Sequence, residues 1–561
     1  MKNFQCNKNG DVYILTNDKH NINLSEDEYK KRQRLKERVK EIGIDEIIEE
    51  ASYTWFNRII AIRYMEINDY LPLTINNQSL GIRILSSKDN TPDPEIMKFS
   101  NLINPDLDIR FEKEEYLKLK DTNEKFKYIL LKICYKLGII IPQIFGGHTD
   151  YIDVLLPDNL LNDSGFVNKL ITDVPEDNFS NVEIIGWLYQ FYISEKKDEV
   201  FVALKSNKKI ENNDIPAATQ LFTPDWIVKY MVENSLGQFW IEHNSEYTES
   251  DDWKYILNNS ILKCSTNVNI ENIKFLDPCC GSGHILIYAF EVFYKIYASL
   301  GYKKSDIPKL ILKNNLFGLD IDERAEQLSC LSIALKAMEY DKNIFSEDII
   351  FNLNVTSIEK SKGFDFSIEI EDDIKSLIIY LIDLFKDAKD IGSILKIKPI
   401  NIELLEEYIS KSDNIYSYQV KTLVQPLIKQ YKILTQMYDI VVTNPPYMGA
   451  SSMNNVLRNY LNKNYNYCKQ DLFAVFIDKC MDLCKTNGYF SLIMPPSILF
   501  LGTFEKIREK ILRETTIISL LHMGRGIFGV DFGSTAFVIK KGKIENFKGK
   551  YFRLHGVRID I

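Results

Sequence analysis

The chain has 561 residues, 45% of them hydrophobic and 12% aromatic, which is enough apolar material for two or three cores. No apolar run reaches the roughly 18 residues of a membrane span, and the first residues, MKNFQCNKNGDVY, contain no apolar signal segment. The nine cysteines show neither zinc-site spacing nor a disulfide framework. We therefore expect a cytoplasmic protein with reduced thiols, no membrane segment and no metal site.

Residues 1–214 have the pattern of a mostly helical domain. It begins with the charged segment SEDEYKKRQRLKERVKEIG (25–43) and continues into the more apolar TWFNRIIAIRYME (54–66). Arg58 and Arg63 interrupt the apolar face of this second segment. Two roles are open for these arginines, pairing with carboxylates or contact with nucleic acid, and pairing is favoured.

Residues 217–240, AATQLFTPDWIVKYMVENSLGQFW, contain a helix start. The hydroxyl of Thr223 is predicted to cap the helix, and Pro224 is predicted to be the first helical residue. A capped amphipathic helix is the simplest interpretation of this segment.

The segment 273–284 runs from a hydrophobic strand through FLDPCCGSGH into an apolar helix. A strand, an acidic residue and a Gly-Ser-Gly turn are how a Rossmann-like sheet brings its backbone close to a cofactor. Asp277, Pro278, Gly281 and Gly283 are therefore candidate cofactor-binding residues. Capping of the following helix is an alternative role for Asp277.

A second acidic strand end follows in NNLFGLDIDERAEQLSCLSIALKA (314–337). Residues 316–319 are predicted to be a short buried strand, followed by a long helix. Asp320 lies at the strand end, where folds of this kind accept the ribose hydroxyls of a bound nucleoside. Asp322 could instead be the N-cap of the following helix, and a capping role does not exclude contact with the cofactor.

Residues 359–436 resemble a helical insertion, because IEDDIKSLIIYLIDLFKDAKDIG has helical periodicity. The sequence does not indicate what this insertion does. It divides the two acidic strand ends from the next motif.

An apolar strand then ends in Asn-Pro-Pro-Tyr, within YDIVVTNPPYMG (438–449). The side-chain carbonyl of Asn444 and the backbone carbonyl of Pro445 can hold both hydrogens of a planar amino group, which biases its nitrogen towards a reactive, tetrahedral geometry. Pro445 and Pro446 stiffen the loop and remove N–H donors. Tyr447 offers a π-face for an unstacked base. A tight turn at a strand end is the alternative explanation.

Beyond this motif we predict a helix over 471–484, a turn at Asn487 and Gly488, and a strand over 489–494, with Phe473 in the core. A closing hairpin strand is predicted over 528–542, with Gly533 and Ser534 at its turn. The chain has a net charge of −9 but is locally basic near its end, at Lys540, Lys541, Lys543, Lys548 and Lys550. These lysines fit either a solvated hairpin or a phosphate contact.

Together, the glycine turn and Asn-Pro-Pro-Tyr indicate an enzyme that moves a methyl group from S-adenosylmethionine to an amino group. In that case Phe222 and Thr223 are placed against the methionine end of the cofactor. The predicted fold is α/β, a Rossmann-like methyltransferase sheet over 215–540 with a helical insertion and a mostly helical N-terminal domain. Residues 541–561 are predicted to begin a further C-terminal region.

The motifs LFTP, DPCCGSG, LDID and NPPY, in this order, resemble motifs X, I, II and IV of the gamma class of adenine-N6 DNA methyltransferases. Three longer runs, 53–72, 183–201 and 215–237, resemble the PglX methyltransferases of BREX phage-defence systems. This resemblance covers nearly the whole chain. It implies site-specific methylation of double-stranded DNA at N6 of adenine, which marks host DNA, and a role in phage exclusion together with other defence proteins.

The sequence departs from that family in one respect. PglX-like proteins continue into a target-recognition region, whereas this chain ends at Ile561 on RLHGVRIDI. We therefore expect a fragment, a split subunit or a truncated reading frame, whose recognition part lies elsewhere.

Other functions are weighed against this one. TPDPEIMKF (91–99) lacks the Glu-x-Lys of a metal-dependent nuclease, so a fused restriction enzyme is disfavoured. Methylation of a protein glutamine or of an RNA amine remains an alternative, because a planar amide poses the same chemical problem. A catalytically inactive interaction subunit of a defence complex is the third.

Overall fold

The chain forms two compact units, Met1–Ile185 with Ala334–Asn352, and Gly186–Ile333 with Leu353–Ile561. The computed structural model describes residues 6–9, 12–15, 26–71, 74–75, 78–79, 81–89, 91–99, 116, 118–146, 151–191, 222–244, 247, 252–257, 267–342, 344, 353–364, 371–411, 415–528 and 533–554.

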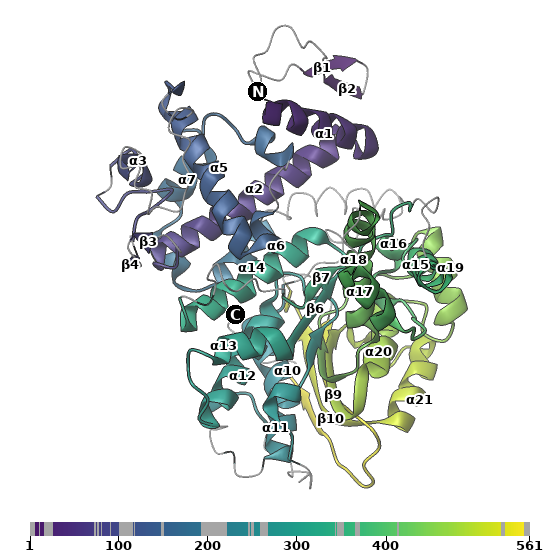
Figure 1. Ribbon diagram of the computed structural model, residues 1–561. Coiled ribbons are helices and arrows are strands. Elements are labelled where there is room, and N and C mark those ends of the chain that lie inside the picture. Colours follow the sequence, from purple (N-terminus) through teal and green to yellow (C-terminus); the bar gives the residue numbers. More distant parts are fainter. Residues whose placement is uncertain are drawn as a thin grey trace. The chain divides into compact units, whose positions relative to one another are not determined.

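The first unit is mostly helical in its described residues, as predicted. Two long helices, α1 (Glu26–Ile42) and α2 (Ile44–Ile67), are separated by a single glycine with a positive φ of 88° (Figure 1). Two short hairpins accompany the helices. The remaining elements are β1 (Cys6–Asn9), β2 (Val12–Leu15), β3 (Thr74–Ile75), β4 (Gln78–Ser79), α3 (Ile96–Phe99), α5 (Thr122–Ile140), α6 (Pro142–Phe145), η1 (Tyr151–Leu155), α7 (Phe166–Asp173) and η2 (Glu176–Ser180).

The two arginines of α2 are buried and paired with carboxylates. The Arg63 guanidinium lies 2.6 Å from Glu66 and 3.1 Å from Glu176. That of Arg58 lies 3.3 Å from Asp153. A buried guanidinium needs such partners because an unpaired charge in the interior is costly. The favoured prediction for these residues, pairing, is confirmed.

The second unit is built on an eight-stranded sheet in the order β12-β10-β11-β9-β8-β5-β6-β7. Neighbouring strands from β7 to β9 run parallel, while β11 runs antiparallel to both β9 and β10. The strands are β5 (Phe275–Asp277), β6 (Leu316–Asp320), β7 (Val355–Ser357), β8 (Tyr438–Thr443), β9 (Cys484–Met494), β10 (Thr515–Arg525), β11 (Gly533–Lys541) and β12 (Lys550–Arg553).

Strand β5 is the point at which the chain changes direction across the sheet. The chain moves outwards from β5 to β6 and β7, then returns to add β8 and β9 on the other side of β5. In open α/β sheets the crevice at the carboxyl ends of such strands is where ligands bind. The predicted Rossmann-like sheet is confirmed, and its topology places the ligand crevice beside β5, β6 and β8.

Helices cover both faces of this sheet (Figure 1). On one face, the buried side chains of α20 (Leu472–Leu483) and α21 (Glu505–Glu514) form a single hydrophobic core with the helices of the predicted insertion, which include α18 (Ile415–Thr435). The helices of this unit, with α14 running on into the first, are α10 (Asp225–Val232), η4 (Glu233–Gly237), α11 (Gln238–His243), η6 (Ile270–Asn272), α12 (His284–Ser299), α13 (Ile307–Leu310), η7 (Ile311–Asn315), α14 (Glu323–Tyr340), α15 (Asp372–Leu384), α16 (Ala388–Ile391), η8 (Gly392–Ile394), α17 (Ile402–Lys411), α18 (Ile415–Thr435), α19 (Asn455–Asn464), α20 (Leu472–Leu483), η9 (Pro496–Leu499), η10 (Gly502–Phe504) and α21 (Glu505–Glu514). The insertion is helical, as its periodicity predicts.

Two local predictions in this unit are wrong. Strand β9 already begins at Cys484, so the Asn487–Gly488 bend is an irregularity inside the strand, where Asn487 has a φ of 67°. Gly533 and Ser534 pair with Arg525 and Gly524 as the first residues of β11, and so they do not form the hairpin turn. In both cases pairing with a neighbouring strand extends regular structure into a sequence with turn character.

Among the described residues, no helix combines the length and apolar character needed to cross a bilayer. Seven cysteines are free thiols, as predicted for those positions: Cys134, Cys279, Cys280, Cys330, Cys468, Cys480 and Cys484.

The basic end of the chain contains a buried ion pair. The Lys540 side chain is 5% exposed, and its Nζ lies 2.5 Å from a carboxylate oxygen of Glu242, which is 1% exposed. The same Nζ lies 5.0 Å from the ring centroid of Tyr489, whose hydroxyl donates to the other Glu242 oxygen. Lys540 therefore has a structural role. Both roles predicted for it, a solvated position and a phosphate contact, are wrong.

Replacing Lys540 with methionine should lower the free energy of unfolding by about 3–5 kcal/mol, because it leaves the Glu242 carboxylate buried and unpaired. The exposed Lys548 provides a matched control, since Lys548→Met should change stability by less than about 0.5 kcal/mol. Denaturant unfolding followed by circular dichroism measures both. Equal stability of the two variants would contradict the buried pair.

Candidate active site

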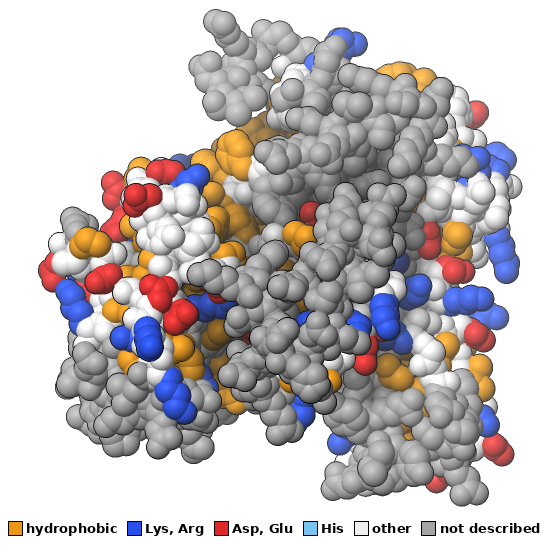
Figure 2. Space-filling view, turned by 90° about the horizontal axis from the view of Figure 1, so that it is seen from above, with side chains coloured by type: hydrophobic (Ala, Val, Ile, Leu, Met, Phe, Trp, Pro, Cys, Tyr) orange, Lys and Arg blue, Asp and Glu red, His pale blue; other side chains and the backbone are white. Residues whose placement is uncertain are grey.

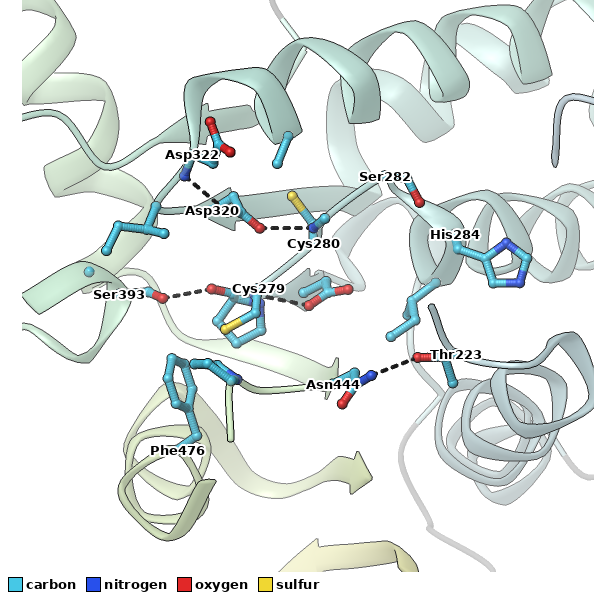
Figure 3. Close-up of a pocket in the computed structure, with 18 of the residues that line it drawn as sticks. Thr223, Cys279, Cys280, Ser282, His284, Asp320, Asp322, Ser393, Asn444 and Phe476 are labelled. Carbon is cyan, nitrogen blue, oxygen red and sulfur yellow. Dashed lines mark hydrogen bonds between the residues drawn. The ribbon is translucent and has the colours of Figure 1, made fainter. Parts of the chain in front are cut away.

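A cavity of about 300 Å³ opens in the second unit at the carboxyl ends of β5, β6 and β8 (Figure 3). Eight of the eleven predicted site residues line it: Phe222, Thr223, Asp277, Pro278, Gly281, Asp320, Asn444 and Pro446. The other three, Gly283, Pro445 and Tyr447, lie directly beside lining residues in sequence but are not part of the lining. The structure thus brings together the two sequence motifs that are about 160 residues apart.

The glycine turn after β5 is bound to the end of β6. The N–H of Gly281 donates to a carboxylate oxygen of Asp320 at 2.9 Å, and the N–H of Cys280 donates to the carbonyl of Leu319 at 2.9 Å. Gly281 has a φ of 51°, a backbone conformation that residues other than glycine rarely adopt. The turn therefore presents bare backbone to the cavity.

Gly283 is required for a different reason. It is the N-cap of α12 with a φ of 82°, and a Cβ added there would lie 3.0 Å from the hydroxyl of Ser329. That hydroxyl donates to the carbonyl of Gly281 at 2.8 Å. Gly283 thus allows α14 to approach the turn and hold it, although Gly283 does not line the cavity.

Two buried carboxyl groups lie at the strand ends. Asp277 is 1% exposed, and one of its oxygens accepts the N–H of Cys279 at 3.0 Å. Burial raises the pKa of Asp277 to about 7, and burial also raises the pKa of Asp320 to about 6. Around neutral pH both carboxyl groups therefore titrate, and a cation or a hydrogen-bond donor placed beside them would favour their ionised forms.

The capping alternatives for these aspartates are also resolved. Asp322 precedes α14, and its carboxylate accepts the N–H of Arg324 at 3.0 Å, so it caps that helix. Asp277 does not cap α12, whose N-cap is Gly283. Both Asp320 and Asp322 line the cavity, and Asp320 also accepts the N–H of Asp322 at 3.0 Å.

The prediction for the start of α10 is wrong. Pro224 has an extended conformation, with a ψ of 139°, so the helix begins one residue later, at Asp225, and has no side-chain cap. The Thr223 hydroxyl instead accepts a hydrogen bond from Nδ2 of Asn444 at 3.0 Å (Figure 3). Residues 217–221 of the same motif lie outside the described residues.

The Asn-Pro-Pro-Tyr loop leaves the end of β8 and is held by two hydrogen bonds of Tyr447. Its hydroxyl lies 2.8 Å from Oδ1 of Asn444 and 3.1 Å from the carbonyl of Ile493 in β9. Burial raises the pKa of Tyr447 well above its usual value, so the hydroxyl keeps its proton. The Tyr447 ring meets Phe473 edge-on, with 6.4 Å between centroids. Phe473 is 1% exposed, which confirms its predicted place in the core.

His284 was missed by the sequence analysis. Its ring packs on Phe222, with 4.7 Å between centroids, and both side chains line the cavity. Burial lowers the pKa of His284 to about 4, so the imidazole is neutral at pH 7. Its Nε2 is buried and has no hydrogen-bond partner in the described part of the chain. A polar residue directly after the third position of Gly-Ser-Gly, at the start of an apolar helix, was the available signal.

The helical insertion also reaches the cavity, through residues 390–393. The Ser393 hydroxyl donates to the carbonyl of Pro278 at 2.6 Å, and Nζ of Lys389 donates to the carbonyl of Ile321 at 3.2 Å. Asp390 accepts from Nδ2 of Asn454 at 2.7 Å. These bonds fix one wall of the cavity. No sequence motif marks them, because they form between distant segments.

Several known proteins are similar to this chain in sequence. Residues 314–528 match the family model of the Eco57I restriction-modification methylase. The chain is 34% identical over 574 residues to the adenine-specific methyltransferase BrxX of Escherichia coli O9:H4 (strain HS), covering 93% of this chain and 46% of BrxX. It is 34% identical over 585 residues to the adenine-specific methyltransferase PglX of Lacticaseibacillus casei (strain Zhang), covering 95% of this chain and 47% of PglX.

A more distant relative is the type II restriction enzyme and methyltransferase RM.Eco57I of Escherichia coli, which is 24% identical over 387 residues, 66% of this chain and 32% of that protein. The chain spans about half the length of BrxX and PglX. These matches confirm the predicted resemblance of the chain to PglX methyltransferases. Along nearly its whole length the chain is similar to the adenine-specific methyltransferases BrxX and PglX.

Proposed function

We propose that this chain carries the cofactor-binding and catalytic part of a site-specific DNA methyltransferase, which moves a methyl group from S-adenosylmethionine to N6 of adenine in a BREX-type or restriction-modification system. One observation carries the proposal. A single cavity holds the bare glycine turn, the two titrating carboxyl groups and the amide of Asn444. The relatives BrxX and PglX, by name adenine-specific methyltransferases, support adenine as the target base.

The residues of the cavity fit S-adenosylmethionine. Asp320 offers a carboxylate for the ribose hydroxyls, and Asp277 offers one for a positively charged group. The orphaned Nε2 of the neutral His284 offers a polar contact beside Phe222 and Thr223, where the methionine end was predicted. The cofactor supplies a methyl group on a positively charged sulfur, and the chain's own groups bind and orient it.

The amino group to be methylated lies, in this proposal, against Asn444 and Pro445. Oδ1 of Asn444 and the carbonyl of Pro445 accept its two N–H bonds and direct its lone pair towards the methyl group. A base inside a duplex cannot reach such a cavity, so the adenine enters as an extrahelical base. Tyr447 is proposed as its stacking partner, and the ring then has to present a face in place of the edge-on contact with Phe473.

Charge gives limited support for DNA binding by this part of the protein. The net charge is −9, and on the face seen in Figure 2 acidic and basic side chains of the described residues are interspersed. Phosphate contacts normally require lysine and arginine. Double-stranded DNA is proposed as the substrate on the strength of the site and the relatives, and other defence-system proteins are proposed as partners.

The direct test uses tritiated S-adenosylmethionine with duplex DNA, RNA or protein, followed by single-base mapping of N6-methyladenine. We expect label in DNA, at adenine. Label confined to RNA or to glutamine in protein would assign one of the alternative substrates, and cofactor binding without transfer to any of the three would indicate an inactive subunit.

A side chain at position 283 should weaken cofactor binding for two reasons: the positive φ, and a clash with Ser329. Gly283→Ala is expected to weaken S-adenosylmethionine binding at least tenfold, because the added Cβ displaces Ser329 from the turn. Gly301 has nearly the same φ, 81°, with nothing within 4 Å of an added Cβ, so Gly301→Ala bears the same strain of roughly 1–2 kcal/mol without the clash. Isothermal titration compares them. Equal affinities would show that the turn does not contact the cofactor.

Cofactor affinity should rise with pH as Asp277 ionises. With a pKa of about 7 in the free protein, binding that needs the carboxylate is roughly tenfold weaker at pH 6 than at pH 8. Asp277→Asn should bind more weakly and lose this part of the pH dependence. The cofactor's own titration is common to both proteins, so the difference between the two titration series isolates the carboxyl group. Parallel pH profiles would remove Asp277 from the site.

Asn444→Ala should lower the rate of methyl transfer by orders of magnitude while S-adenosylmethionine affinity stays within about twofold, because the lost interaction is made at the reacting nitrogen. Asn462, exposed on α19, provides the matched control, and Asn462→Ala should leave both quantities unchanged. Single-turnover kinetics and titration give the two numbers. A parallel loss of cofactor binding and rate in Asn444→Ala would place Asn444 in the cofactor site instead.

A further inference from the structure

The hydroxyl of Thr223 has an unexpected partner. Thr223 is 5% exposed, lies two residues before α10, and makes no cap for that helix. Its Oγ1 accepts the N–H of the Asn444 side chain at 3.0 Å, across 221 residues of sequence. The two residues line the same cavity from separate elements and face each other in Figure 3.

We propose that Thr223 is a positioning residue for methyl transfer, which acts through the amide of Asn444. The inference rests on the proposed function and deepens it. By accepting from Nδ2, the hydroxyl of Thr223 commits Oδ1 of Asn444 to the opposite direction, where the amino group is methylated. In this role Thr223 contributes to the rate of transfer more than to cofactor affinity.

The amide of Asn444 needs such a partner. The terminal torsion of an asparagine is broad and roughly two-fold, so the amide turns readily when one end is unrestrained. Here Nδ2 is held by Thr223 and Oδ1 by the hydroxyl of Tyr447. The two bonds hold the amide plane at both ends. Loss of the bond to Thr223 removes one of these two restraints on the acceptor.

The bond from Tyr447 does not prevent Oδ1 from accepting the substrate. A carbonyl oxygen has two lone pairs, so a bond from the hydroxyl and a bond from an incoming amino group can coexist. The proton of Tyr447 also has a second acceptor, the carbonyl of Ile493 at 3.1 Å. The hydroxyl can therefore give up its share in Oδ1 and remain anchored to β9. Thr223 is the partner that stays throughout.

The position of Thr223 is itself fixed. Pro224 follows it with an extended backbone, and Phe222 before it packs on the ring of His284. A Cβ on Gly186 would approach the Phe222 ring to 3.1 Å, so this segment has little room to move on that side. The hydroxyl is thus presented by a stiff segment, as a positioning group requires.

The test compares Thr223→Val, which removes only the hydroxyl, with Thr223→Ser, which keeps it. Thr516→Val is the control. Thr516 lies in β10 and is buried to a similar degree, at 6% exposed. Its hydroxyl donates to the carbonyl of Gly542, and it does not line the cavity. We expect Thr223→Val to lower the single-turnover rate about tenfold at saturating S-adenosylmethionine, with cofactor affinity within twofold of wild type. Thr223→Ser should restore most of the rate, and Thr516→Val should not change it.

A double-mutant cycle separates this role from others. If Thr223 acts through Asn444, Thr223→Val causes no further loss of rate in the Asn444→Ala background. Weaker cofactor binding with an unchanged saturated rate would overturn the inference and make Thr223 a cofactor contact. Equal rates of Thr223→Val, Thr516→Val and wild type would overturn it as well.

A readout independent of activity keeps the inference distinct from the proposed function. With ¹⁵N-labelled asparagine, the Asn444 side-chain NH₂ signals are assigned by their loss in Asn444→Ala. We expect Thr223→Val to shift or broaden this pair, and Thr516→Val to leave it in place. An unmoved pair would overturn the inference even if the wild-type protein methylates DNA. A shifted pair in a wild-type protein without methyl transfer would overturn the proposed function, and would leave only the contact between Thr223 and Asn444.

Discussion

The hydrogen bond from the N–H of Gly281 to the carboxylate of Asp320 ties the turn after β5 to the end of β6, and the cavity depends on it. It requires the positive φ of Gly281, which glycine adopts at little cost. The other carboxylate oxygen of Asp320 holds the N–H of Asp322 at the start of α14. One side chain therefore fixes the glycine turn and the entry to a helix, and two strand ends together define the binding site.

Burying carboxyl groups at this point has a cost in stability. The pKa values of Asp277 and Asp320 in the folded protein, about 7 and about 6, are above those of an unfolded chain. The folded state thus binds more protons, and the stability that these groups contribute is present below about pH 4 and is lost as pH rises through their folded pKa values. A cationic ligand beside the carboxylates offsets this loss. A site that is unfavourable when empty is favourable for binding, which is a common relation between stability and function.

Local patterns accounted for the parts of the site that could be predicted. The strand ends at Asp277 and Asp320, the glycine turn and Asn-Pro-Pro-Tyr are short runs whose chemistry is complete within a few residues, and the sheet topology brings them together. The helical insertion and the cap at Asp322 could also be predicted from local sequence. The predictions that were wrong concerned residues whose partners lie far away in the sequence. The Thr223 hydroxyl is taken by Asn444, 221 residues away, and Lys540 is taken by Glu242, 298 residues away. Pairing with Arg525 drew Gly533 into a strand.

The lysines near the end of the described chain show how tertiary structure redirects charge. Lys540 is buried against Glu242, Nζ of Lys541 donates to the carbonyl of Cys484, and Nζ of Lys543 donates to the carbonyl of Leu512. These three neighbouring lysines thus pair with acceptors of the protein itself. Long-range attraction of a polyanion needs charge that faces solvent. In the proposed function, this part of the protein therefore gains its affinity for adenine at short range, from a clamped amide and an aromatic ring, and the field that draws in the duplex has to come from other basic residues.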